Sequence, residues 1–171
     1  MQTKNIFTKK FKSPVGNLHL FATETHLIGL LFDNDETTFL KHFKNAKVVT
    51  GSNAILSETM IQLKQYFAGT RKKFNLNLFA AGTEFQKKVW SELSRIPFGK
   101  TITYKAQAQR IKSPKAVRAV GAANGKNPLA IIIPCHRVVG SNGKLVGYVG
   151  GQNLKSALLK LEGLNFPIDI G

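Results

Sequence analysis

The first part of the chain combines strand-like and helix-like patterns of hydrophobic residues. Leu18, Leu20 and Ala22 stand at every second position, and residues 27–32 are an apolar run. Period-two alternation predicts a half-buried strand, and apolar residues three or four positions apart predict one face of a helix. The helical spacing holds for four apolar residues before Gly69: Leu56, Met60, Leu63 and Phe67. These patterns predict a small α/β domain.

A second domain is predicted to begin after the link at residues 80–82. Thr83 and Gln86 have the spacing of a capping box, which marks the start of a helix. Its apolar stripe consists of Phe85, Val89, Trp90 and Leu93. We therefore divide the chain into an N-terminal domain, residues 1–82, and a C-terminal domain, residues 83–171.

Two short helices joined by a tight turn are predicted next. Thr103 is placed to cap a helix that runs to about Ile111, and Ser113, followed by Pro114, is placed to cap a second one. The second helix carries small side chains up to the Asn-Gly pair at 124–125, so its backbone can approach a neighbour or a groove closely. This pattern is typical of a helix-turn-helix.

The remaining elements are a strand and a final helix. Residues 129–133 are a short apolar run that predicts a buried strand, which Pro134 ends because proline cannot continue a ladder. Cys135 is therefore expected at a strand end, facing a cleft. A helix starting at Gln152 or Asn153 has four residues on its predicted apolar face: Leu154, Ala157, Leu158 and Leu161.

The charge of the chain indicates a polyanionic partner. The 171 residues carry a formal net charge of +16, and 43% of them are hydrophobic, which is enough to build a core. Residues 93–161 contain no acidic residue, so nucleic acid is expected to bind there. We find no basic amphipathic helix or long apolar run for a membrane, and no secretory signal at the start. We therefore expect a cytoplasmic protein, or a nuclear one in a eukaryote.

Cys135 is the candidate nucleophile, and it is the only cysteine. A lone cysteine is usually a small hydrophobe, but His136 and Arg137 follow it, and nearby positive charge or a base makes a thiol reactive. Because adjacent side chains on an extended chain point to opposite faces, His136 needs a bend after Pro134 or an intervening water. Glu162 opposes the dipole at the end of the last helix, so it is either a partner for His136 or a surface charge.

A longer motif around this cysteine has a known counterpart. The pentapeptide PCHRV lies within NPLAIIIPCHRVVG (127–140), with RAVGAANGK before it and GYVGG and LLKLEG after it. Together with these flanking segments, the pentapeptide resembles the motif of the O6-alkylguanine-DNA alkyltransferases, also called methylated-DNA-protein-cysteine methyltransferases. The likeness extends from about Ile55 to about Gly163, through QYFAGTRKKF, GTEFQKKVW, IPFGKTITY and SPKAVRAVG. It implies an α/β ribonuclease-H-like N-terminal domain and a mainly α, winged-helix-like C-terminal domain with a helix-turn-helix.

The resemblance also implies roles for individual residues. Cys135 resembles the alkyl acceptor, and His136 the base that acts on it through a water. Glu162 resembles the residue that polarises this histidine, and Asn127 the asparagine that braces the helix-turn-helix against the cysteine turn. Tyr104 is similar to the tyrosine that helps to turn the 3′ phosphate of the extruded nucleotide and contacts its base.

The DNA contacts implied by the resemblance centre on the second helix of the helix-turn-helix, which enters the minor groove. Arg118 resembles the arginine that fills the stack left by the extruded nucleotide, although its spacing alone fits a surface charge equally well. Further contacts are implied for Thr103, Tyr104, Ser113, Lys115, Ala119, Ala123 and Arg137. The guanine pocket is implied to be lined by Pro134, Val138, Tyr148 and Val149. Many relatives have serine or alanine at Val149, and a glycine is often found at Lys112.

The implied function is DNA repair by direct transfer of an alkyl group from O6-alkylguanine to Cys135, with O4-alkylthymine as a second candidate substrate. The partner is double-stranded DNA containing the lesion, and the protein is expected to be a monomer without DNA. No metal or cofactor is required, and each molecule acts once because a thioether is a poor leaving group. The alternatives are an alkyltransferase-like protein that binds the lesion without repair, a winged-helix regulator and a Cys-His hydrolase.

Overall fold

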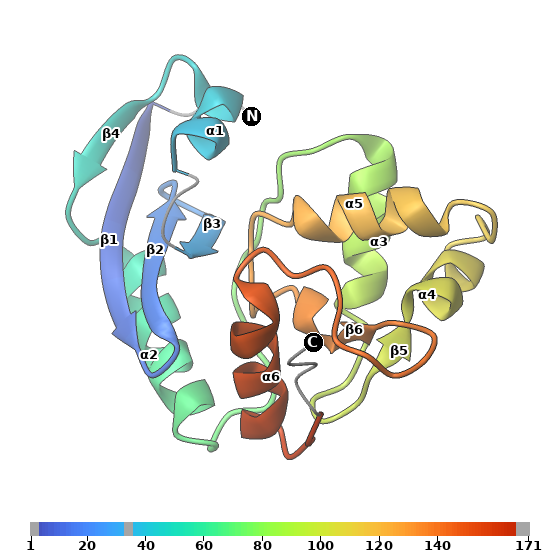
Figure 1. The fold of residues 1–171 in the computed structure, drawn as a ribbon. Coiled ribbons are helices and arrows are strands. Elements are labelled where there is room, and N and C mark those ends of the chain that lie inside the picture. The colour runs from blue at the N-terminus through green and yellow to red at the C-terminus, as the bar shows by residue number, and fades with distance from the viewer. Residues whose placement is uncertain (1–3, 33–35, 167–171) are drawn as a thin grey trace. The chain divides into compact units, whose positions relative to one another are not determined.

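The computed structural model describes residues 4–32 and 36–166, which form two compact units. Unit 1 comprises Met1–Ala81 with Pro128–Ala130, and unit 2 comprises Gly82–Asn127 with Ile131–Gly171. Unit 1 is rich in strands and unit 2 is mainly helical (Figure 1). The two-domain organisation with an N-terminal sheet is therefore present, but three residues from the later part of the chain belong to the first unit.

Unit 1 is built on a four-stranded sheet in the order β3-β2-β1-β4. Its strands are β1 (Asn5–Ser13), β2 (Gly16–Ala22), β3 (Leu27–Phe32) and β4 (Lys47–Thr50). β1 pairs antiparallel with β2 and parallel with β4, and β2 pairs antiparallel with β3. The run predicted at 27–32 is therefore a strand with those bounds.

Helices contact the sheet of unit 1 and bury more of β2 than its alternation predicts. α2 (Ala54–Phe67) packs against β1, β2 and β3. A second apolar cluster joins Phe21 of β2 to Phe39 in α1 (Glu36–Leu40) and to the buried end of η1 (Lys41–Phe43). Consecutive residues of β2 are buried as a result, because side chains on both faces of the strand are covered.

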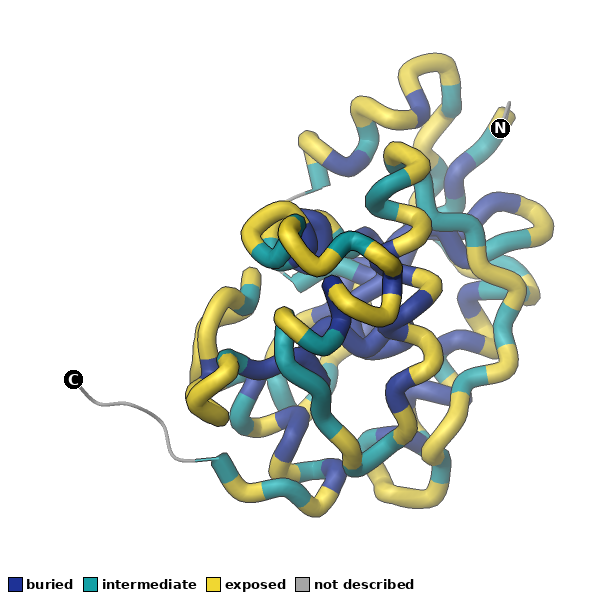
Figure 2. Tube along the Cα trace, turned by 90° about the vertical axis from the view of Figure 1, so that its right-hand side faces the viewer, coloured by how far each residue is buried: buried dark blue, intermediate teal, exposed yellow. Residues whose placement is uncertain are grey.

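Unit 2 contains four named α-helices in its described residues, and the sequence predicts the starts of α3 and α4 but not those of α5 and α6. They are α3 (Glu84–Leu93), α4 (Tyr104–Arg110), α5 (Val117–Gly125) and α6 (Gly151–Leu161). The capping box of α3 is confirmed, with Gln86 N donating to Thr83 Oγ1 at 3.2 Å and Thr83 N donating to Gln86 Oε1 at 2.9 Å. Each of these helices has both buried and exposed residues. Figure 2 shows how buried, intermediate and exposed residues are distributed along the chain trace. In the parts of the chain that the structure describes, no helix is long and apolar enough to cross a membrane.

A short strand pair positions the start of α4. β5 (Ile102–Thr103) pairs in parallel with β6 (Val138–Val139). Thr103 Oγ1 then accepts a hydrogen bond from Ala106 N at 3.1 Å, which confirms it as the cap of α4. Because β6 directly follows the segment of the cysteine, this pairing brings Tyr104 close to that segment.

Buried hydrogen bonds fix α4 and α5 to each other. Gln107 Nε2 donates to Asn124 Oδ1 at 3.1 Å, and Asn124 Nδ2 donates to Gln107 Oε1 at 2.7 Å. Trp90 Nε1 donates to the carbonyl oxygen of Ala123 at 2.8 Å and so ties α3 to α5. Directional bonds therefore set the helix pair in addition to apolar packing.

The start of α5 differs from the prediction. Ser113 is not its cap, since Ala116 holds that position and makes no side-chain capping bond. Residues 113–116 instead form a turn in which Ala116 N donates to Ser113 O at 2.9 Å. This turn delays the helix until Val117.

The apolar run at 129–133 is buried but is not the predicted strand. Leu129 alone pairs, through an isolated bridge to Leu30 of β3. Ile131 has a φ of 69°, which ends extended pairing, and the prolines on both sides of the run have no N–H to donate. Cys135 therefore follows a turn and not a strand end.

The buried face of α6 also differs from the prediction. The helix begins at Gly151, before the predicted start, and Ala157 of the expected apolar face is exposed. Its buried residues are Lys155, Leu158 and Leu159. Hydrophobic spacing could not predict this face because a lysine counts as polar wherever it lies.

Lys112 offers a test of the turn between α4 and α5. It follows the C-cap of α4 with a φ of 58°, a conformation that costs a non-glycine residue about 1–2 kcal/mol. We predict that Lys112→Gly raises the free energy of unfolding by about 1 kcal/mol, measured by urea denaturation. Lys112→Ala removes the same charge but keeps the strain, so it should give no such gain; equal stability of the two variants would contradict the argument.

Candidate active site

Cys135 lies in a single 3-10 turn, η2 (Cys135–Arg137), directly before β6. The thiol is 8% exposed, so it is almost closed off from solvent. The turn is the bend after Pro134 that His136 needs in order to serve the thiol. Local backbone geometry therefore removes the objection raised by an extended chain.

Asn127 holds the cysteine turn. Its Nδ2 donates to Ile133 O at 2.7 Å and to Cys135 Sγ at 3.3 Å. Burial raises the pKa of the Cys135 thiol, and the hydrogen bond from Asn127 opposes that rise, as does the charge of Lys155. A buried thiol with a raised pKa needs a base to ionise at neutral pH.

A buried network of hydrogen bonds centres on Glu162, the C-cap residue of α6. His136 Nε2 lies 2.7 Å from Glu162 Oε1. Arg137 Nε donates to Oε2 at 2.9 Å, and Arg137 Nη2 donates to Oε1 at 3.0 Å. Gly99 N donates to Oε2 at 3.1 Å. His136 is 0% exposed and Glu162 is 5% exposed, so the carboxylate is the predicted partner of the histidine in position as well as in charge.

The network fixes the protonation of both residues. Burial alone would raise the pKa of Glu162, but the hydrogen bonds from His136 and Arg137 outweigh it and lower the pKa to about 2. Burial lowers the pKa of His136, against the opposing effect of Glu162. In a neutral ring, the nitrogen that faces the carboxylate carries the proton. His136 Nδ1 is buried and has no hydrogen-bond partner in the described part of the chain, so its lone pair is available as a base.

Tyr104 and Lys155 are two further polar residues whose charges interact with that of Cys135. Tyr104 Oη donates to Val146 O at 3.0 Å and lies 3.3 Å from Gly147 O. Burial raises the pKa of Tyr104 to about 12, and the charge of Cys135 adds to this effect. Lys155 Nζ donates to Val146 O at 2.8 Å and lies 3.5 Å from Tyr104 Oη.

Lys155 is the residue that the sequence analysis missed. It is fully buried, and burial lowers its pKa to about 8. A signal existed, because Lys155 stands seven residues before Glu162 and so shares its side of α6. This spacing predicts that Lys155 lies on the same helix face as Glu162 and makes it a candidate site residue.

The residues expected to line a guanine pocket lie in different environments. Pro134 and Val138 are buried, and the ring centre of half-buried Tyr148 is 6.0 Å from Lys155 Nζ. Val149 is 67% exposed. The structure thus brings three of these residues to the inner part of unit 2 and leaves the fourth side chain at the surface.

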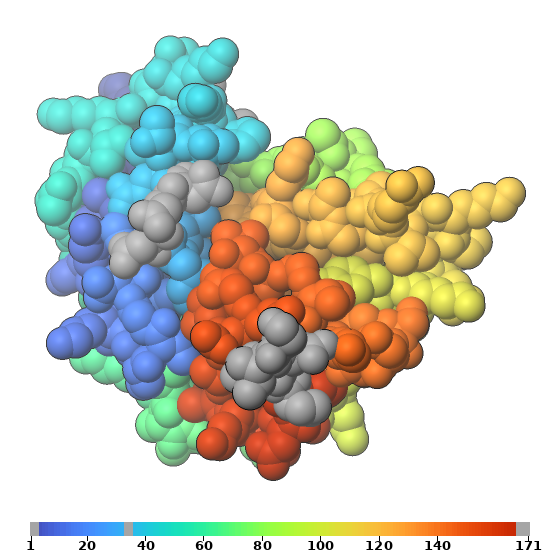
Figure 3. Space-filling model, in the orientation of Figure 1, coloured from blue at the N-terminus to red at the C-terminus, as the bar shows by residue number. Residues whose placement is uncertain are grey.

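The residues expected to touch DNA are divided in the same way. Lys115, Arg118 and Ala119 are exposed, and Thr103 and Ser113 are half-buried. The start of α5 and the turn before it project uncovered at the right of Figure 3. Two other predicted contacts do not lie on this surface. Ala123 is 4% exposed against α3, and Arg137 is 6% exposed with its guanidinium bound to Glu162 and to Ile96 O.

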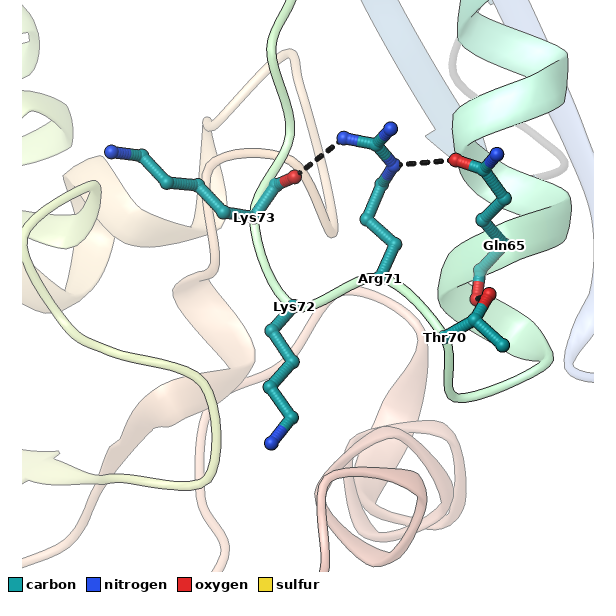
Figure 4. A pocket seen from close by; sticks show the side chains of 5 residues that line it. All are labelled: Gln65, Thr70, Arg71, Lys72 and Lys73. Carbon is teal, nitrogen blue, oxygen red and sulfur yellow. Dashed lines mark hydrogen bonds between the residues drawn. The ribbon is translucent and has the colours of Figure 1, made fainter.

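An open hollow of about 450 Å³ lies in unit 1, and none of the residues that line it is a predicted site residue (Figure 4). It is lined by Gln65, Thr70, Arg71, Lys72 and Lys73. Arg71 is held by Gln65 Oε1 at 2.7 Å and by Lys73 O at 2.9 Å. The hollow is basic, and its lining has no cysteine, histidine or carboxylate. Within residues 4–32 and 36–166, no three His, Cys, Asp or Glu side chains gather where they could hold a metal ion.

Sequence comparisons match most of the chain to known proteins. Residues 6–80 match the model described as 6-O-methylguanine DNA methyltransferase, ribonuclease-like domain, and residues 84–164 match its DNA binding domain. The methylated-DNA–protein-cysteine methyltransferase of Methanosarcina acetivorans is 47% identical over 156 residues, which cover 90% of this chain and 96% of the relative. The constitutive enzyme of that name from Bacillus subtilis is 41% identical over 157 residues, which cover 91% and 94%.

Solved structures agree with the sequence matches. The crystal structure of Mycobacterium tuberculosis O6-methylguanine methyltransferase superposes with a TM-score of 0.81 at 41% identity, covering 96% of this chain and 97% of the other. The M. tuberculosis protein OGT in complex with DNA gives a TM-score of 0.80 at 42% identity, covering 92% of each chain. The chain therefore belongs to the 6-O-methylguanine DNA methyltransferase family.

Proposed function

We propose that this protein repairs DNA by moving an alkyl group from O6 of guanine to Cys135 Sγ, irreversibly and once per molecule. One observation carries the proposal: a nearly buried cysteine is followed by a fully buried histidine. Its Nε2 lies 2.7 Å from Glu162 Oε1, and its Nδ1 has no partner among the described residues. The relatives named methylated-DNA–protein-cysteine methyltransferases support the choice of reaction.

The first step is ionisation of the thiol. His136 Nδ1 takes the proton of Cys135 through one intervening water, because it is the ring nitrogen with a free lone pair. The resulting imidazolium is stabilised by Glu162, which stays ionised because its pKa is about 2. Asn127 donates to the sulfur and to Ile133 O, so it orients the nucleophile.

The second step is displacement at the alkyl carbon. The sulfur of Cys135 forms a bond to that carbon while the carbon–O6 bond breaks and its electron pair stays with guanine. The proton removed from the thiol returns to guanine, so the products are normal guanine and a thioether. Tyr104 keeps its own proton at neutral pH, since its pKa is about 12, and its hydroxyl can donate a hydrogen bond to the base. No step restores the thiol.

The base reaches the sulfur by leaving the double helix. We assign unit 2 to the winged-helix-like class, with α4 and α5 as its helix-turn-helix, and unit 1 to the ribonuclease-H-like class. α5 lies in the minor groove, where exposed Ala119 permits close approach and exposed Arg118 fills the vacated stack. Extrusion costs a few kcal/mol, so a side chain that occupies the gap favours the extruded state. Lys115 adds a contact to a phosphate.

Further assignments follow from this reaction. The partner is double-stranded DNA containing O6-alkylguanine, with O4-alkylthymine as a second substrate. The protein acts as a monomer in the cytoplasm, or in the nucleus of a eukaryote, because that is where its substrate lies. We keep the domain division at residues 1–82 and 83–171. A protein that binds the lesion without repairing it is the second candidate, and it would have no use for the thiol and base described above.

Incubation with a duplex that carries O6-methylguanine tests the proposal. We predict that the peptide of Cys135 gains one methyl group in place of a hydrogen, in a one-to-one ratio with protein and without added metal. Mass spectrometry of the digested protein measures this gain. Cys135→Ala should bind the same duplex and gain no mass. Tight binding by the native protein with no methyl gain would favour the lesion-binding candidate.

Arg118→Ala separates base extrusion from chemistry. We predict at least a tenfold slower transfer from duplex DNA, because extrusion costs a few kcal/mol, and an unchanged rate with free O6-benzylguanine. Single-turnover kinetics on both substrates measure the two rates. Arg95→Ala removes an exposed arginine from the same unit outside α5 and serves as the control. Equal losses on both substrates would exclude the extrusion role.

Glu162→Gln tests the charge network. We predict that transfer slows by roughly a hundredfold or more. At pH 7 the free energy of unfolding should fall by about 3–5 kcal/mol, because a buried guanidinium loses its partner. The pKa of Glu162 is lowered to about 2 from its ordinary value of 4.5, so its stabilisation is complete above 4.5 and is lost as the pH falls towards 2. The stability difference between the two proteins should therefore shrink below pH 4.5.

Glu92→Gln is the matched control for this variant. Glu92 is also buried, but its partners Arg95 and Arg110 are at least half exposed and lie outside the site. This variant should lose less stability and transfer at the native rate. Urea denaturation at pH 7 and pH 3 and single-turnover transfer supply the measurements. A pH-independent stability loss in Glu162→Gln would show that the carboxylate charge is not the stabilising feature.

A further inference from the structure

Lys155 is a buried cation that has no carboxylate partner within residues 4–32 and 36–166. Its side chain is 0% exposed in the middle of α6, and among the described residues its Nζ donates to neutral oxygens, Val146 O at 2.8 Å and Tyr104 Oη at 3.5 Å. None of the ion pairs among the described residues includes it. A buried ammonium is costly unless it is paired, so this arrangement calls for a negative charge that forms during function.

The groups around Lys155 restrict where that charge forms. Tyr104 faces it from α4, and its pKa of about 12 keeps it neutral. The ring of Tyr148 faces it from the loop before α6, at 6.0 Å from its centre. η2 packs against α6, and its charged residues His136 and Arg137 already pair with Glu162 at the end of α6. Cys135 remains as the group in these surroundings that becomes an anion in the reaction.

We propose that Lys155 is the counter-charge of the Cys135 thiolate, a positioning residue whose ammonium is held by Val146 O and Tyr104 Oη so that the anion forms at lower cost. This inference rests on the proposed function, in which that thiolate is the nucleophile. Lys155 keeps its own proton throughout, since the proton of the thiol goes to His136. The interaction is electrostatic and breaks no bond.

The electrostatics of the pair act in both directions. The charge of Lys155 lowers the pKa of Cys135, and the charge of Cys135 raises the pKa of Lys155, which burial otherwise lowers. Such coupling has to be reciprocal, because it is one free energy seen from two groups. Alkylation converts the sulfur into a neutral thioether. The alkylated protein therefore retains a buried lysine that can no longer pair with a Cys135 thiolate.

The first test measures ionisation of the thiol without DNA. Lys155→Met removes the ammonium with little change in length, and the pH dependence of Cys135 modification by iodoacetamide reports its pKa. We predict that the midpoint rises by about one pH unit or more, which makes modification at pH 7 about tenfold slower. Lys160→Met removes an exposed charge from the same helix and should leave the midpoint unchanged. A native midpoint in Lys155→Met would overturn the proposal.

The second test needs no variant at Lys155, so it remains informative if Lys155→Met does not fold. NMR titration of the Lys155 side chain is compared between the native protein and Cys135→Ser. We predict that the pKa of Lys155 falls in Cys135→Ser, because serine does not ionise beside it; an unchanged pKa would refute the pairing. The proposed function fails separately, if alkylated duplex leaves Cys135 unmodified while both titrations still show the coupling.

Discussion

The hydrogen bonds of the buried Glu162 carboxylate are the interactions on which the rest of unit 2 depends. The carboxylate accepts hydrogen bonds from Arg137 and from Gly99 N and lies 2.7 Å from His136 Nε2, so it joins the end of α6 to η2 and to the loop before β5. A carboxylate at a helix C-terminus opposes the helix dipole. The hydrogen bonds from His136 and Arg137 favour the ionised carboxylate and lower the pKa of Glu162 to about 2. The bonds that hold this part of the fold therefore also orient the base.

α6 serves the site with two charges of opposite sign. Glu162 stands at its end and faces the histidine, while Lys155, seven residues earlier, faces the surroundings of the cysteine. The carboxylate favours a proton on His136, and the ammonium favours its removal from Cys135. Both effects help to move one proton from sulfur to nitrogen. A single helix thus sets the protonation of nucleophile and base, which explains why a polar residue is buried where an apolar stripe was expected.

Local signals in the sequence predicted local structure, and tertiary contacts account for the failures. The caps at Thr83 and Thr103 depend on atoms three residues away and were confirmed. The strand at 129–133 failed because its pairing depends on Leu30 and on a positive φ at Ile131, and neither is visible in a run of apolar letters. The Cys-His-Glu set was available from the family motif. Lys155 was missed because hydropathy assigns every lysine to the surface.

The protonation state of His136 decides whether the thiol has a base, and nitrogen NMR measures it directly. In protein labelled with 15N at its histidines, the ring of His136 should be neutral at pH 7, with its proton on Nε2 and a free lone pair on Nδ1. This state follows from the carboxylate that faces Nε2 and from the burial that lowers the pKa of the ring. A neutral ring with its proton on Nδ1 at that pH would leave no base for the thiol and would contradict the mechanism.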